Sequence, residues 1–346
     1  MNGNYRRLAL AALLLALVVV SLGAYVRLSD AGLGCPDWPG CYGKLVGVPD
    51  QAHEIKAAEA SFGKPVEAPK AWKEMIHRYA AGLLGLAILA LAAMAWRQRQ
   101  HRKPWLEILL LAVVTGQALL GMLTVTRLLK PVIVTSHLLG GMSTLALLAV
   151  LVLRDQGTRR APPKALPGGL RVLGALALFA VLVQIALGGW VSSNYAAAIC
   201  ADFPTCQGRW WPEMDTHHAF TLDRELGATA SGALLSGAAL TAIHWAHRLG
   251  AGMVLLLAGG FGLRLLARAE TRIHGQWLLA ALLLQLGLGI ANILLQLPLP
   301  LAVAHNTGAA LLLVTTLAAT ARVFQRSEAR HRYTMGGFTR QFQTVR

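Results

Sequence analysis

The stretch Gly23-Ala-Tyr-Val26, followed by Cys35-Pro-Asp-Trp-Pro-Gly-Cys41, decides the fold because it occurs twice. Gly188-Gly-Trp-Val191 and Cys200-Ala-Asp-Phe-Pro-Thr-Cys206 repeat it at a constant offset of 165 residues. In both copies an aspartate, an aromatic residue and a proline stand at matching places between two cysteines. Such self-similarity at a fixed distance predicts a duplicated architecture.

Apolar runs of about 20 residues surround these motifs, and a run of that length matches the hydrocarbon core of a bilayer. The 346-residue chain is 55% hydrophobic and 14% charged, which excludes an ordinary soluble domain. Because backbone groups inside a bilayer must hydrogen-bond internally, we expect an all-α integral membrane protein. The eight predicted transmembrane helices are 8–27, 74–96, 105–126, 131–153, 170–191, 238–264, 275–296 and 301–322.

Later landmarks keep the same order in both halves: His77-Arg78 matches His247-Arg248, and His137 matches His305. Four spans per half predict two pseudo-symmetric four-helix bundles, related by an axis along the membrane normal. The expected domains are an N-terminal bundle (1–154), a cytoplasmic linker (155–169), a C-terminal bundle (170–323) and a basic cytoplasmic tail (324–346).

The net charge of +16 reflects topology rather than a nucleic-acid site. Arginines and lysines fill the short loops on one side of the predicted spans, whereas most acidic residues fall on the other side. The positive-inside rule then places both termini in the cytoplasm and the cysteine loops outside a bacterial plasma (inner) membrane. We therefore expect membrane lipid, and no nucleic acid, among the partners.

All four cysteines lie in two outer loops, one pair in each half. An oxidising compartment and the paired spacing favour two disulfides, Cys35–Cys41 and Cys200–Cys206. Either pair could brace its loop or act as a reducible redox pair. The spacing is wider than in usual zinc fingers and the pairs belong to separate halves, so a zinc site is disfavoured.

Four histidines fall within or at the edge of spans, close to the outer ends: His77, His137, His247 and His305. Since an ionisable group facing lipid is costly, each should face the bundle interior. A small residue follows each histidine three positions later, on the same helix face: Ala80, Gly140, Gly250 and Gly308. Small residues there suit either a flat macrocycle against the helix or close helix packing.

Two neutral imidazoles per half, without a carboxylate or thiolate ligand, suit the two axial positions of haem iron. Mononuclear zinc would need more protein ligands, whereas copper stays open. Arg78 and Arg248 each follow a histidine at the water boundary. They could pair with haem propionates or extend to the lipid interface.

The halves differ at Glu74, one helical turn before His77, where the second half has His244. A carboxylate there could move protons or stabilise positive charge beside a porphyrin, or it could pair with Arg78 or Lys73. His244 is either an alternative ligand or a hydrogen-bonded interfacial histidine. This divergence predicts one structural and one working site.

Together these landmarks on eight spans resemble the haem A synthase family over nearly the whole chain. The resemblance implies an oxidoreductase that converts the C8 methyl of haem O to a formyl group by successive hydroxylations, giving haem A for terminal oxidases. It implies that His247 and His305 hold a permanent haem b. It further implies that His77 and His137 bracket the substrate haem O, with Glu74 catalytic, and it links Cys35–Cys41 to activity.

The same resemblance implies a haem O synthase and an unidentified electron donor as partners, and a homo-oligomer is a further option. Two other functions stay open, a dihaem cytochrome b that transfers electrons from quinol and a non-catalytic haem carrier. Histidines at one depth disfavour electron transfer across the membrane. A carrier has no evident need for Glu74 in one half only.

Overall fold

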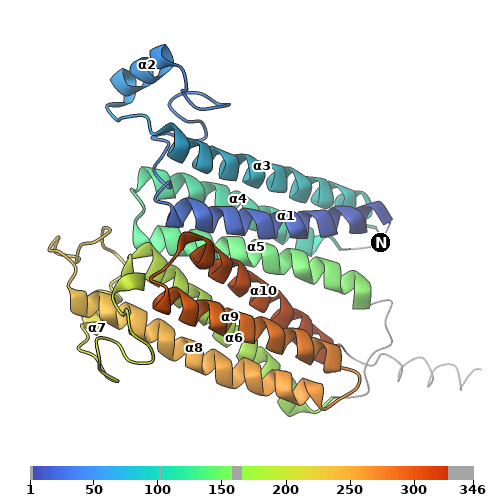
Figure 1. Ribbon diagram of the computed structural model, residues 1–346. Coiled ribbons are helices and arrows are strands. Elements are labelled where there is room, and N and C mark those ends of the chain that lie inside the picture. Colours follow the sequence, from blue (N-terminus) through green and yellow to red (C-terminus); the bar gives the residue numbers. More distant parts are fainter. Residues whose placement is uncertain (1–2, 101–102, 158–165, 326–346) are drawn as a thin grey trace, which may run out of the picture.

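Eight long helices make up most of the protein, and a computed structural model describes residues 3–100, 103–157 and 166–325 (Figure 1). They are α1 (Gly3–Leu28), α3 (Ala68–Arg97), α4 (Trp105–Thr126), α5 (Pro131–Gly157), α6 (Gly168–Ser193), α8 (Gly237–Leu266), α9 (Arg272–Leu294) and α10 (Leu299–Phe324). Each is long and apolar enough to cross a membrane. The expected all-α fold with eight spans is confirmed.

The predicted spans are shorter than several of the helices, because a helix continues beyond its apolar core into the interface. The largest difference is at α3, which begins at Ala68 rather than at residue 74. Three short helices in the loops were not predicted: α2 (Ala52–Phe62), the 3-10 turn η1 (Ala196–Ala198) and α7 (Thr216–Ala219). We call the end of the molecule that carries these three helices the loop end (Figure 1).

The long helices form two sets with the same order of neighbours. In the first set, α1 and α4 each pack against both α3 and α5. In the second, α6 and α9 each pack against both α8 and α10. Between the sets α1 contacts α10, α5 contacts α6, and α5 contacts α10. A two-fold axis between α5 and α10 would exchange the α1–α10 contact with the α5–α6 contact. On this pattern we propose that the two sets are the duplicated bundles 1–154 and 170–323.

Matching positions of the two halves meet at the loop end of this boundary. Arg27 donates a hydrogen bond of 2.8 Å to the carbonyl of Ser192, the residue at its own position in the second half. Tyr195 donates one of 2.9 Å to Asp30, again at a matching position. Contact between equivalent residues is expected beside a two-fold axis. Most of the expected linker 155–169 and tail 324–346 lies outside the described residues.

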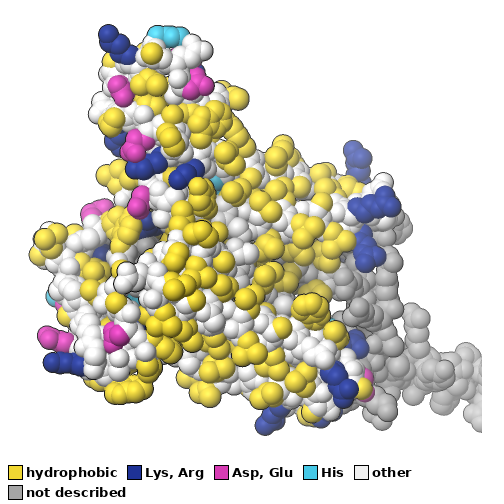
Figure 2. All heavy atoms as spheres, viewed as in Figure 1, with side chains coloured by type: hydrophobic (Ala, Val, Ile, Leu, Met, Phe, Trp, Pro, Cys, Tyr) yellow, Lys and Arg dark blue, Asp and Glu magenta, His cyan; other side chains and the backbone are white. Residues whose placement is uncertain are grey.

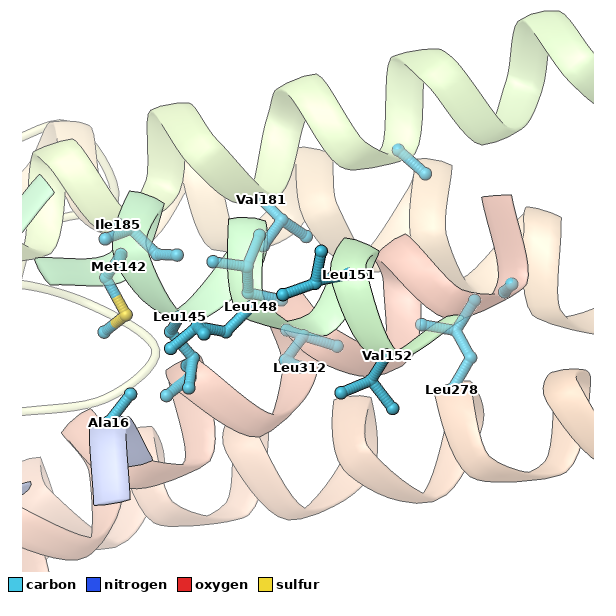
Figure 3. Packing of buried hydrophobic residues seen from close by; sticks show 14 of the residues in the cluster. Ala16, Met142, Leu145, Leu148, Leu151, Val152, Val181, Ile185, Leu278 and Leu312 are labelled. Carbon is cyan, nitrogen blue, oxygen red and sulfur yellow. The ribbon is translucent and has the colours of Figure 1, made fainter. Parts of the chain in front are cut away.

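Alanines line the buried face of α1, and large apolar residues are exposed on its outer face. On α1 the buried residues include Ala9, Ala12 and Ala16, whereas Leu14 is 65% exposed. Leucines of α5 fill the boundary between the sets, together with Val181 and Leu312 (Figure 3). Figure 2 shows hydrophobic side chains over the middle of the molecule and most acidic ones at the loop end. This surface fits a protein that is solvated by lipid.

Close packing at the other end of the bundle predicts a strong difference between two glycines of α9. A Cβ on Gly275 would lie 2.8 Å from the carbonyl oxygen of Gly262 on α8, whereas one on Gly287 would meet nothing within 4 Å. We expect Gly275→Ala to destabilise the protein by about 1–3 kcal/mol through overpacking. Gly287→Ala should be neutral. Thermal unfolding in detergent, followed by circular dichroism, measures both, and equal midpoints would contradict this packing.

Candidate functional site

Two disulfide loops dock on the loop end, and they are built alike. The structure joins Cys35 to Cys41 and Cys200 to Cys206, the pairings expected from the spacing. In each loop the second cysteine forms an isolated antiparallel bridge with the residue three positions later, Lys44 or Arg209. The repeated motif therefore specifies a compact turn that a disulfide and a β-bridge close, rather than a flexible connection.

The repeated aspartate explains how each turn is held. Asp202 accepts the backbone N–H groups of Gln207 (2.7 Å) and Gly208 (3.0 Å). Asp37 does the same for the two matching residues of the first loop. Hydrogen bonds from the Thr205 hydroxyl and from these N–H groups lower the pKa of Asp202 to about 2. Its charge therefore holds the turn at every pH above that value.

Arg78 and Arg248 bind these loops through main-chain carbonyls. Arg248 donates to Thr205 (2.6 Å) and Cys200 (2.9 Å). Arg78 donates to Asp37 (3.0 Å) and Gly40 in the first loop. Their role as partners of haem propionates stays a prediction, because the loop contacts already account for much of their hydrogen bonding.

The diverged pair Glu74 and His244 also contacts the loops. Both side chains are buried. Glu74 accepts the N–H of Cys35 at 3.0 Å and pairs with Arg78 at 2.5 Å. Lys73, the other partner considered, lies over the ring of Tyr25 instead. His244 donates from Nδ1 to the carbonyl of Ala196 at 2.9 Å, which supports the interpretation as a hydrogen-bonded interfacial histidine.

Each of the four span histidines lies against a glycine of the preceding long helix. A Cβ on that glycine would come within 3.0–3.4 Å of the imidazole Cε1. The pairs are Gly23 with His77, Gly121 with His137, Gly188 with His247, and Gly289 with His305. All four histidines belong to the half of their helix that is nearer the loop end. The helices therefore approach closely at four matching places and leave room there for an imidazole.

The two histidines of the second set face each other. The ring centroids of His247 and His305 are 6.5 Å apart and the rings are nearly perpendicular, at 79°. Two metal–imidazole bonds of about 2 Å, with about 1 Å from each nitrogen to its ring centre, give a separation of about 6 Å. The separation of the two rings is therefore close to that of two axial ligands of one iron. In the first set, His77 and His137 are close enough for a charge on one ring to affect the other.

The donor set also fits a haem better than a bare ion. The Nδ1 atoms of His77, His137 and His305 are buried without a hydrogen-bond partner among the described residues. Within those residues no group of three or more His, Cys, Asp or Glu side chains is placed to hold a metal ion. Haem needs only two axial protein ligands because its porphyrin supplies the other four nitrogens.

The small residues after the histidines have a different role from the macrocycle contact considered above. A Cβ on Gly140, Gly250 or Gly308 would collide with a glutamine side chain of the adjacent helix. These glutamines are Gln117, Gln184 and Gln285. The interpretation as close helix packing is therefore the better one for these three positions.

Two of these glutamines touch the histidine rings, and sequence reasoning missed them. Gln184 Nε2 lies 3.0 Å from Nδ1 of His247 and donates at 2.9 Å to its carbonyl. Gln285 Nε2 lies 3.3 Å from Nε2 of His305. A signal was present, because Gln-x-x-x-Gly occurs on three of the four preceding helices, ending at Gly121, Gly188 and Gly289.

Comparisons with known proteins identify relatives over most of the chain. The family described as cytochrome oxidase assembly protein matches residues 6–317. The heme A synthase of Shewanella oneidensis is 42% identical over 308 residues, which cover 88% of this chain and 92% of the relative. That of Sphingopyxis alaskensis is 30% identical over 355 residues, 94% and 93% of the two chains. That of Rhodopseudomonas palustris is 28% identical over 354 residues, 93% and 91%.

The contacts of Arg248 predict that it protects one disulfide. Arg248→Gln removes the two hydrogen bonds to Cys200 and Thr205, so a soluble thiol should reach the Cys200–Cys206 bond more often. We expect reduction to be faster on the order of tenfold, equivalent to one lost hydrogen bond. Timed alkylation with mass spectrometry measures the rate. Cys35–Cys41 in the same molecule is the control, and an unchanged ratio of the two rates would contradict the role of Arg248.

Proposed function

This chain belongs to the haem A synthase family, and from that premise we propose that it oxidises the C8 methyl group of haem O to a formyl group by successive hydroxylations. The product is haem A for terminal oxidases. The observation that carries the proposal is the pair His247 and His305, whose rings are spaced for one iron between them. A second pair in the other set, His77 and His137, would hold a second haem.

The two pairs would have different tasks. His247 and His305 would hold haem b as a permanent cofactor, and His77 and His137 would bracket haem O as substrate. Iron in such a site supplies the redox chemistry, and the protein supplies binding and orientation. The support for this division is that the first set has a carboxylate, Glu74, at the position where the second set has His244.

Glu74 is the proposed catalytic group, holding or transferring a proton at its carboxylate beside the substrate. It lies one helical turn from His77 on α3, so both face the same side of the helix. The Arg78 guanidinium and the Cys35 N–H fix the carboxylate. This contact also gives a physical reason for a link between Cys35–Cys41 and activity, because a change in the loop would move Glu74.

The protein is an integral membrane protein of the bacterial inner membrane. We propose that both termini face the cytoplasm and that the loop end lies outside. The partners would be haem O and haem A, a haem O synthase that supplies the substrate, an electron donor and membrane lipid. A homo-oligomer belongs to the same proposal, whereas nucleic acid is not an expected partner.

Production of haem A tests the function directly. Expressed together with a haem O synthase, the protein should yield haem A on extraction of the membranes. The double variant His247→Ala/His305→Ala should lose haem b and, with it, haem A. The matched control is His244→Ala, which removes a buried histidine that bonds a loop carbonyl and should keep haem b. Extraction of haem O alone from membranes with the unaltered protein would refute the proposed enzymatic activity.

Replacement of Glu74 separates chemistry from loop docking. Glu74→Gln keeps an oxygen for the Cys35 N–H but removes the charge and the proton capacity, so haem b should remain. We expect haem A production to fall about 10²–10⁴-fold, the usual range for a general acid or base. His244→Gln, at the matching position of α8, should have little effect. Full activity of Glu74→Gln would reduce Glu74 to a structural contact.

A further inference from the structure

Three of the four helix pairs share one arrangement of residues around the histidine, and the fourth pair differs from it. Three pairs have a glutamine four residues before the supporting glycine and a second glycine three residues after the histidine. The fourth pair, α1 with α3, has Val19 and Ala80 at these two positions. Val19 nevertheless occupies the matching place, because its backbone lies beside the ring of His77. His77 therefore differs from the other three histidines in its support.

The glutamine and the second glycine form a matched pair. A Cβ at Gly250 would overlap the Gln184 side chain, and the same holds for Gly308 with Gln285 and Gly140 with Gln117. Where the glutamine is replaced by a valine, the glycine is replaced by an alanine. The smaller side chain of Val19 thus leaves space that the methyl of Ala80 can use. The departure at His77 is a coordinated change of two positions.

Gln184 and Gln285 are placed to fix the orientation of two rings. The Nε2 atom of Gln184 contacts both the ring Nδ1 and the main-chain carbonyl of His247. These two contacts restrict rotation of the imidazole relative to the backbone of α8. Gln285 contacts the ring of His305. A polar neighbour in contact with a metal-ligating histidine restricts the orientation of its ring. Val19 has no polar side chain with which to do this for His77.

We propose that His77 is the releasable ligand of the substrate haem, whereas the positioning residues Gln184 and Gln285 keep both ligands of the permanent haem in place. This inference rests on the proposed function. On release, the coordinate bond between His77 and the iron opens, and the imidazole keeps its lone pair. His77 would then turn about its side-chain bonds and leave one face of the haem open. Glu74 lies one helical turn before His77 on α3.

An exchange of the paired residues between the two sets tests this directly. Val19→Gln/Ala80→Gly installs the missing pair at His77, and Gln184→Val/Gly250→Ala transfers the arrangement of His77 to His247. Double variants are needed because the glutamine and a Cβ at the second position collide. Each protein is expressed with a haem O synthase, purified, reduced and mixed with carbon monoxide, which binds only where an axial ligand leaves. The haem of the unaltered set reports correct folding in each variant.

The readout is the rate and extent of carbon monoxide binding at each haem, followed by its absorption spectrum. We expect binding at the substrate haem to fall about 10–100-fold in Val19→Gln/Ala80→Gly, the usual effect of a hydrogen-bonded neighbour on a metal ligand. Binding at haem b should rise by a similar factor in Gln184→Val/Gly250→Ala. Unchanged binding in either variant would overturn the inference. Because the measurement needs no turnover, this pattern without haem A would refute only the proposed function.

Discussion

An imidazole inside a bilayer must find a ligand or a hydrogen-bond partner, and the whole bundle is arranged around four such rings. Each ring stands against a glycine of the preceding helix, so that helices α1 and α3, α4 and α5, α6 and α8, and α9 and α10 approach closely at one level. Glycine is favoured there because an added Cβ would come within 3.0–3.4 Å of the ring. The same four glycine–histidine contacts therefore determine both which helices pair and where the candidate haem sites lie.

The two sets of helices are built on a similar plan, and several differences between them lie close to His77. The disulfide turns agree in their aspartates, their bridges and their docking arginines. The departures that matter for chemistry are Glu74 in place of His244, Val19 in place of Gln184 and Ala80 in place of Gly250. All three adjoin His77. Such differences beside one ligand are expected when one site is fixed and the other performs a reaction.

The spans, the disulfides and the four histidines were predictable because each has a local signature. Residues 105–126 were predicted and found as α4, and both cysteine pairs follow from their spacing. Contacts that depend on the rotation of two helices were not predictable. Arg78 was a predicted partner of Glu74, but the bond from Cys35 to Glu74, the bond from His244 to Ala196 and the contact of Gln184 with His247 all require knowing which faces meet. The glycines after the histidines were recognised, but the side chain that fills their space lies on another helix.

The turn of α3 from Glu74 to Arg78 joins the loop to the haem site, and this limits how the site can work. Glu74 and Arg78 hold the disulfide turn, while His77 between them faces a neighbouring helix. A rigid helical turn cannot move the carboxylate without moving the imidazole, so changes in the loop reach both groups together. In the proposed release, His77 would rotate its side chain, because displacement of the helix would move Glu74 as well. Such a rotation is easier for a ring that no glutamine side chain contacts, and Val19 in place of glutamine meets that condition at His77.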